Sequence, residues 1–387
     1  MRADVLTGDA LKVLRGMPNE SVHMVCTSPP YWGLRDYGVE GQIGREPSPG
    51  AWVAALVRVF AEARRVLRKD GTLWLNVGDC YAGDGGTGSG GSMVGDVRAW
   101  KERGYRPRVP RGTKRKDLLG LPWALAFALR DDGWWLRADN IWHKTNPLPE
   151  SVTDRPARAH EYVFLLSKSA RYYYDQEAVR QPLAERTFSS YGSVRQIVGG
   201  ENDREIAANR ISRTMPERKP RLLEDGSPAG ANLRTVWSIA SEPFKGAHFA
   251  TFPTELARRC IDAGSSAMGA CETCGAPLRR RQEESGTVSY GGGRRKIADV
   301  RPRQGVHGAL ATGLTKTYRT VGWRSACRCG AGASPAIVLD PFAGAGTVGI
   351  VAGRLGRNFI GIELKPEYAE MARGRIRADA SLLSEVS

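Results

Sequence analysis

The chain has 387 residues, of which 41% are hydrophobic and 25% charged, which predicts an ordinary globular protein of two domains or one enlarged domain. The formal net charge of +16 favours a polyanionic partner, nucleic acid above all, over a small acidic substrate. The start lacks the apolar core of a secretory signal, and the longest apolar run, 121–129, is too short to span a bilayer.

The first part of the chain alternates strand and helix patterns. Short buried strands are predicted at 2–6 and 21–26, and a further strand at 71–78. Apolar residues at nearly helical spacing predict a helix over 51–68. Strand, helix and strand in this order favour an α/β fold in which helices cover a parallel sheet.

The sequence TSPPYW, residues 27–32, directly follows the second predicted strand. Proline has a fixed φ and no N–H, so a Pro-Pro step cannot continue a helix or an inner strand. We therefore predict a stiff turn at the carboxyl end of that strand, where open α/β sheets bind ligands. Taken alone, the motif also fits a plain turn with packed aromatic side chains.

Two adjoining stretches interrupt the regular pattern. Residues 82–96 are rich in Gly and Ser, and residues 101–116 hold eight Lys or Arg and one Glu. We expect 82–116 to form a flexible basic loop that contacts phosphates, with a solvated surface loop as the alternative. The candidate DNA-binding residues of this loop are Arg106, Arg108, Arg111, Lys114 and Arg115.

The middle of the chain returns to regular patterning on both sides of an irregular region. Strands are predicted at 134–144 and 161–168, and a helix at 249–263. Between them, residues 176–235 are polar, mixed in charge and irregular. The candidate DNA-binding residues of this irregular region are Arg195 and Arg213.

A second insertion, residues 266–335, carries two close cysteine pairs. Cys271 and Cys274 form a C-x-x-C pair, and Cys327 and Cys329 a C-x-C pair. Four thiolates can bind one structural zinc ion, and a glycine follows the second cysteine of each pair, as in knuckle turns. The alternative is a set of reduced thiols in a surface loop, and zinc is favoured over it. The zinc is predicted to pin the ends of a basic flap.

A glycine-rich loop follows the predicted strand 336–340 near the end of the chain. In the sequence DPFAGAG, Gly344 and Gly346 allow the backbone to approach a ligand, and the next helix presents its N-terminus there. Glu363 ends the following strand, where a ribose hydroxyl pair could be held. Asp340 would repel a phosphate but suits a cationic ligand, so S-adenosylmethionine fits better than a nicotinamide dinucleotide.

These motifs together resemble the DNA amino-methyltransferases of the β order, in which a Pro-Pro-Tyr loop precedes the cofactor loop. TSPPYW resembles the catalytic motif of that family and DPFAGAG its cofactor motif. Further resemblances in family order lie at 6–11, 70–75, 140–144, 160–165 and 248–253. The resemblance implies a Rossmann-like S-adenosylmethionine-dependent methyltransferase fold, a mixed sheet with helices on both faces.

The resemblance also implies the roles of the site residues. The Ser28 hydroxyl and the Pro29 carbonyl would accept hydrogens from an exocyclic base amine, and Tyr31 would stack on a base rotated out of the duplex. The implied catalytic residues are Ser28, Pro29, Pro30 and Tyr31. The implied cofactor-binding residues are Asp9, Ala10, Thr27, Phe252, Asp340, Phe342, Ala343, Gly344, Gly346, Thr347 and Glu363.

Ser28 stands where the adenine-modifying members usually carry Asp, so we expect methylation of cytosine N4 in duplex DNA, with adenine N6 as the alternative. A non-catalytic nucleic-acid-binding zinc protein is the alternative from another class. Asn76 or Asp79 is expected either to make another polar contact or to cap a turn. His143, His160 and His248 are expected to pack or hydrogen-bond rather than act as bases.

The expected organisation is a discontinuous methyltransferase domain with two inserts. The domain would comprise 1–175, 236–265 and 336–387, with target recognition by 176–235 and a zinc-binding insert at 266–335. The resemblance further implies the cytoplasm of a bacterium, or a phage acting there. It also implies a monomer or homodimer, with a restriction endonuclease as a possible partner.

Overall fold

The computed structural model describes seven stretches of the chain, residues 2–34, 38–83, 109–110, 112–181, 230–242, 253–290 and 313–384. The chain divides into two compact units. The first unit comprises 1–178, 234–279 and 325–387, and the second comprises 179–233 and 280–324. In the described part of the chain, no helix has the length and apolar character needed to cross a membrane.

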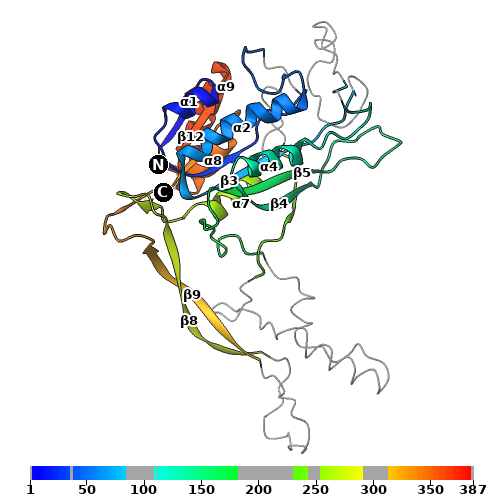
Figure 1. Cartoon of the computed structure of the whole chain (residues 1–387). Coiled ribbons are helices and arrows are strands. Elements are labelled where there is room, and N and C mark those ends of the chain that lie inside the picture. The colour runs from blue at the N-terminus through cyan, green and yellow to red at the C-terminus, as the bar shows by residue number, and fades with distance from the viewer. Residues whose placement is uncertain are drawn as a thin grey trace, which may run out of the picture. The chain divides into compact units, whose positions relative to one another are not determined.

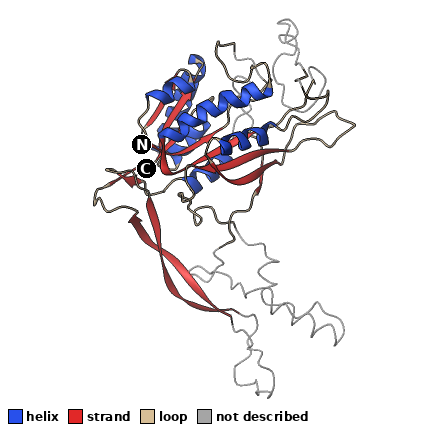
Figure 2. Cartoon of the chain, in the orientation of Figure 1, coloured by secondary structure: helices blue, strands red, loops and turns tan. Residues whose placement is uncertain are grey.

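An eight-stranded sheet forms the centre of the first unit, in the order β1-β12-β11-β2-β3-β5-β4-β6 (Figures 1 and 2). The first five strands in this order are parallel, whereas β5 is antiparallel to both β3 and β4. The mixed sheet is therefore confirmed. The strands are β1 (Ala3–Thr7), β2 (Val22–Thr27), β3 (Leu67–Val77), β4 (Trp135–Lys144), β5 (His160–Ser167), β6 (Val236–Ile239), β11 (Ile337–Asp340) and β12 (Asn358–Glu363).

Helices cover both faces of this sheet. The strand β2 shows the two faces, because Val25 lies in the cluster built by α1, α2 and α4, whereas Met24 lies beneath α7. Burial on both faces explains why β2 and the end of β3 read as continuous apolar runs. The helices are α1 (Ala10–Gly16), α2 (Pro49–Val66), α4 (Leu121–Asp131), α7 (Thr254–Gly264), α8 (Thr347–Arg354) and α9 (Pro366–Ser384).

The predicted helix at 51–68 is confirmed as α2, which begins at Pro49 behind the N-cap Ser48. The helix predicted at 249–263 is observed from Thr254 to Gly264 as α7, and residues 243–252 lie outside the described part. The helices α1, α4 and α9 were not predicted. The helix α1 has only seven residues, too few for a clear periodic pattern.

In the second unit, a short bridge pairs Gln181 with Ala231, and Arg180 donates to the carbonyl of Gly230 over 2.9 Å. The strands β8 (Leu278–Tyr290) and β9 (Gly313–Ser325), most of whose residues belong to this unit, pair with each other as a two-stranded sheet. The Arg280 guanidinium lies 4.5 Å from the centre of the Trp323 ring. These two strands were not predicted, because their polar, Arg-rich sequence lacks alternating apolar residues.

Several predicted site residues lie outside the described part of the chain, and their roles stay predictions. They are the DNA-binding candidates Arg106, Arg108, Arg111, Arg195 and Arg213, the cofactor candidate Phe252, and His248.

Candidate active site

The two sequence motifs meet at the carboxyl ends of neighbouring strands. The strands β2 and β11 are parallel, with Val25 opposite Leu339. Thr27 ends β2 and Asp340 ends β11, and the Thr27 hydroxyl donates a 2.6 Å hydrogen bond to Oδ1 of Asp340. Both residues are buried. The TSPPYW loop and the DPFAGAG loop therefore leave the sheet side by side.

Asp340 is a buried carboxyl group beside the glycine loop. Its Oδ1 accepts from the Thr27 hydroxyl and also from the Phe342 amide, over 3.0 Å. Burial raises the pKa of Asp340 to about 7, although these two hydrogen bonds oppose the shift. A cation bound beside this group would stabilise its ionised form.

The glycine loop is closed against Glu363, the last residue of β12. The amides of Gly344 and Lys365 donate to the two carboxylate oxygens of Glu363, each over 2.9 Å. Gly344 and Gly346 have φ of +51° and +76°, and a Cβ on Gly346 would lie 2.9 Å from the Cβ of Ala372. Glycine is therefore required at position 346 by conformation and by space. Phe342 and Ala343 lie before these glycines, and Thr347 begins α8.

The end of β1 reaches the same edge of the sheet. The Gly8 amide donates to the Glu363 carbonyl over 2.9 Å. Asp9 then acts as the N-cap of α1, accepting from the Lys12 amide over 2.9 Å, and Ala10 is buried behind it. The structure thus brings Asp9, Ala10 and Glu363 together at one end of the sheet.

The TSPPYW loop is fixed by the side chains around it. The Trp52 indole donates to the Pro30 carbonyl over 2.9 Å, and the Trp32 indole donates to the Glu46 carbonyl over the same distance. These indoles and the two proline rings hold the loop backbone rigidly. The Ser28 hydroxyl donates to the Tyr31 hydroxyl over 3.3 Å.

The Tyr31 hydroxyl enters a polar cluster at the ends of β3, β4 and β5. It donates to Oε2 of Glu161 over 2.7 Å and lies 3.3 Å from Oδ1 of Asn76. Its ring packs against Gly78, where a Cβ would lie 2.7 Å from the ring carbon Cε2. Burial, and then the Glu161 charge, raise the pKa of Tyr31 well above its usual value.

Glu161 is a partly buried carboxylate whose two oxygens both have partners. Its Oε1 accepts from Nζ of Lys144 over 2.5 Å, and its Oε2 accepts from Nδ2 of Asn76 over 3.1 Å. Burial alone would raise the pKa of Glu161, but the Lys144 charge and these hydrogen bonds lower it below the usual value. Glu161 is therefore ionised at neutral pH.

The structure separates the two polar candidates at the end of β3. Asn76 lies in the cluster around Tyr31. Asp79 instead caps α4, since its two oxygens accept from the amides of Gly120 and Leu121 over 3.0 and 3.1 Å. His143 bonds the Ser238 hydroxyl over 3.0 Å, and His160 packs edge-on against Tyr162.

Lys114 and Arg115 are exposed in the described end of the basic loop. Lys114 lies 3.7 Å from the Asp117 carboxylate, a loose surface ion pair. Both side chains are accessible to a polyanion.

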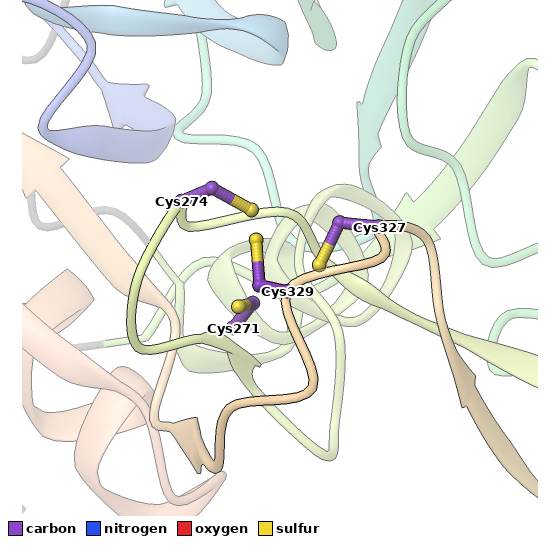
Figure 3. A group of neighbouring side chains, drawn as sticks. All are labelled: Cys271, Cys274, Cys327 and Cys329. Atoms are coloured by element: carbon purple, nitrogen blue, oxygen red, sulfur yellow. The ribbon is translucent and has the colours of Figure 1, made fainter.

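The four predicted metal ligands come together, as Figure 3 shows. The sulfur atoms of Cys271, Cys274, Cys327 and Cys329 all lie within 4.8 Å of one another. Gly275 and Gly330, which follow the second cysteine of each pair, have φ of +67° and +68°. The Gly275 amide donates to the Cys271 carbonyl over 2.7 Å and closes the first turn. The arrangement can hold one tetrahedral metal ion.

The sequence reasoning missed Glu161 and Lys144, and it did not place Asn76 beside Glu161. A signal was present, because Glu161 is an acidic residue near the start of a largely apolar strand. A charge that enters a buried strand needs a partner, and here the partner lies on the neighbouring strand.

Comparison with known proteins identifies relatives over nearly the whole chain. Residues 22–270 and 334–374 match the family model N6_N4_Mtase, described as DNA methylase. The chain is 37% identical to the type II methyltransferase M.Cfr9I of Citrobacter freundii, covering 97% of this chain and 88% of that protein. It is also 37% identical to the type II methyltransferase M.SmaI of Serratia marcescens, covering 96% and 90%.

Among solved structures, the chain resembles the PvuII DNA methyltransferase (cytosine-N4-specific), with a TM-score of 0.50 and 15% identity. The match covers 98% of this chain and 92% of that chain. At this identity the likeness concerns the fold, and it agrees with the mixed sheet described above.

Proposed function

Because the chain belongs to the N6_N4_Mtase family of DNA methylases, we propose that it transfers a methyl group from S-adenosylmethionine to cytosine N4 in duplex DNA. The observation that carries this proposal is the hydrogen bond between Thr27 and Asp340, which joins the TSPPYW loop to the glycine loop. Its type II relatives support a role as the modification enzyme beside a restriction endonuclease. Such an enzyme would act in the bacterial cytoplasm.

The glycine loop and the neighbouring strand ends would bind the cofactor. Both hydrogen bonds to Asp340 end on Oδ1, so Oδ2 can face the amino group or sulfonium of S-adenosylmethionine. Glu363, which accepts from the amide of Gly344, would hold the ribose hydroxyls. Asp9 and Ala10, at the same edge of the sheet, would contact the adenine. The other proposed cofactor-binding residues belong to the glycine loop or begin α8: Phe342, Ala343, Gly346 and Thr347.

The TSPPYW loop would hold the base amine for direct attack on the methyl group. The lone pair of an exocyclic amine is delocalised into the ring, which makes the amine a poor nucleophile. Acceptors at Ser28 and at the Pro29 carbonyl would take its hydrogens and free that lone pair for in-line transfer. The two prolines fix this carbonyl before the substrate arrives, which avoids reorganisation in the transition state.

The target base must leave the duplex to reach these groups, because its amine is otherwise enclosed in the stack. Tyr31, held by Gly78 and Glu161, offers its ring as the surface on which the base stacks. Ser28 favours cytosine over adenine, because the Ser form of the motif resembles that of the cytosine-modifying members. Adenine N6 is the second candidate, because the geometry of the loop suits either amine.

DNA binding would involve the net charge of +16, the exposed Lys114 and Arg115, and the predicted recognition region 176–235. Half or more of the contacts of such proteins address phosphates, and arginines reading guanine edges would supply specificity.

The cysteine cluster is proposed to bind one structural zinc ion. Four thiolates at a Zn–S distance of about 2.3 Å place the sulfurs roughly 3.8 Å apart, so closing the observed cluster needs only small movements. Leu278 begins β8 soon after Cys274, and Ser325 ends β9 just before Cys327. Zinc would therefore tie together the ends of the insert that carries these two strands.

A labelled methyl group tests the proposed activity. Purified protein is incubated with S-adenosylmethionine carrying a radioactive methyl, together with unmethylated bacterial genomic DNA. Label in the DNA is expected, and label in RNA or in the protein itself under the same conditions is not. DNA that stays unlabelled, with no binding of S-adenosylmethionine, would favour the non-catalytic zinc protein instead.

A further inference from the structure

The hydroxyl of Ser28 belongs to a series of hydrogen bonds that ends on a partly buried ion pair. Ser28 bonds Tyr31 over 3.3 Å, and Tyr31 bonds Glu161 over 2.7 Å. The far oxygen of Glu161 bonds Lys144 over 2.5 Å. All members lie in the first unit, on the loop after β2 and on the paired strands β4 and β5.

The direction of each bond in this chain follows from the number of available protons. A carboxylate has no proton to give, so the 2.7 Å bond must be donated by Tyr31. A phenol has one proton, so the Tyr31 oxygen can then only accept from Ser28. The single proton of the Ser28 hydroxyl is thereby used, and only its lone pairs remain for a substrate.

This direction matters because an exocyclic amine offers hydrogens to the loop. A hydroxyl that rotates freely would present its proton or its lone pairs in turn, and only the lone pairs can grip the amine. We infer that Glu161, with Lys144 as its counter-ion, is a positioning residue that sets the hydroxyl of Ser28 as an acceptor for the target amine. This inference rests on the proposed function.

Asn76 and Gly78 complete the arrangement without breaking its direction. The Asn76 side-chain amide donates to Oε2 of Glu161 and to the Tyr162 carbonyl, each over 3.1 Å. Its donors are therefore used on acceptors of β5, and they support a negative charge on Glu161. Gly78 leaves the space that the Tyr31 ring needs.

The test uses Glu161→Gln, which keeps the shape of the side chain but removes the charge. The glutamine amide can donate to the Tyr31 hydroxyl. The tyrosine proton is then free to point towards Ser28, which reverses the direction of the hydrogen bond between Tyr31 and Ser28. The single-turnover rate of methyl transfer is expected to fall about tenfold or more. The dissociation constants for S-adenosylmethionine and DNA are expected to change less than about threefold, since the proposed function assigns Glu161 no direct contact with either.

A double-mutant cycle with Tyr31→Phe separates positioning from a general structural effect. Tyr31→Phe keeps the ring but removes the hydroxyl, and it is expected to lower the same rate by a similar factor. In the Tyr31→Phe background, Glu161→Gln is expected to lower the rate by less than about threefold more, because both substitutions disturb the same series of hydrogen bonds. Glu62→Gln is the matched control, since it removes one partner of the Arg65 ion pair on α2.

Additive losses in the double variant, or Glu161→Gln at the wild-type rate, would overturn the inference. Should Glu161→Gln fail to fold, Tyr31→Phe decides alone. If the rate of Tyr31→Phe stays within about threefold of wild type, the proposed role of Glu161 is rejected. A tenfold loss with unchanged cofactor affinity supports it. A wild-type protein that methylates no DNA would instead reject the proposed function, so the two failures are distinguishable.

Discussion

Thr27 and Asp340 are 313 residues apart in the sequence, yet the hydroxyl of one donates to the carboxyl of the other over 2.6 Å. The pairing of β2 with β11 produces this contact, and it brings the proposed catalytic loop next to the proposed cofactor loop. A base amine held by the first loop and a sulfonium held by the second would then lie in one site.

Replacing Asp340 by asparagine should strongly weaken cofactor binding and raise stability. Asparagine can still accept from Thr27 and Phe342 but cannot pair with a cation. Because burial raises the pKa of Asp340 to about 7, far above its value in an unfolded chain, the ionised carboxyl destabilises the fold at pH 8. We expect Asp340→Asn to gain about 1–3 kcal/mol in unfolding free energy at pH 8. Unfolding by denaturant measures the change in stability, and titration with S-adenosylmethionine measures the loss of cofactor affinity.

The same gain should shrink at pH 4, where the wild-type Asp340 is already protonated in the folded protein. An Asp340→Asn variant that binds S-adenosylmethionine as tightly as wild type would remove Asp340 from the cofactor site.

Cofactor affinity should depend on pH through Asp340. The free protein has a pKa of about 7 at this group, and a cationic ligand needs the ionised form. Below pH 7 binding must first release a proton, so the dissociation constant should rise about tenfold for each pH unit between 6.5 and 5. Calorimetry across this range measures it. In Asp340→Asn the weak residual binding should not follow this slope, and a flat profile in wild type would contradict the account.

A methyl group on Gly78 should damage transfer through Tyr31. The added Cβ would lie 2.7 Å from the tyrosine ring, so the ring must shift. We expect Gly78→Ala to reduce the methyl-transfer rate about tenfold, while S-adenosylmethionine binding is retained. Gly50→Ala is the control, because nothing lies within 4 Å of its added Cβ. An unaltered rate in Gly78→Ala would show that the ring position is not critical.

Purified protein should contain close to one zinc ion per chain. Cys271→Ser or Cys329→Ser should lose the ion and lower the melting temperature, because each removes one of four ligands. Cys80→Ser serves as the matched control, since Cys80 lies outside the cluster. The zinc content of this variant should match that of the wild-type protein. Elemental analysis gives the metal content directly. Reduced wild-type protein without zinc would refute the metal site.

The central strands were predictable because their chemistry is local. The runs at β2, β11 and β12 are short and apolar and end at turn signals, and the Pro-Pro step after Thr27 marks its strand end unambiguously. The cysteine spacing likewise predicted a cluster that the fold assembles across the long insert. In each case a few adjacent residues carried the signal.

The hydrogen-bond chain was not predictable, because it depends on strand order. Glu161 meets Tyr31 only because β5 lies antiparallel beside β3, and it meets Lys144 only because β4 follows on the other side. No spacing within one segment encodes these neighbours. The two strands β8 and β9 were missed for another reason, since their residues are polar and show no buried face in the sequence.

Analysis of the methylated nucleoside reports both the modified base and the need for the TSPPYW loop. Genomic DNA from cells that express the chain is digested to nucleosides and examined by mass spectrometry, beside DNA from cells that express a Ser28→Ala, Tyr31→Ala double variant. We predict N4-methylcytosine with the wild-type chain and its near absence with the double variant. N6-methyladenine alone would contradict the choice of base. Equal methylation by both chains would contradict the role of the TSPPYW loop.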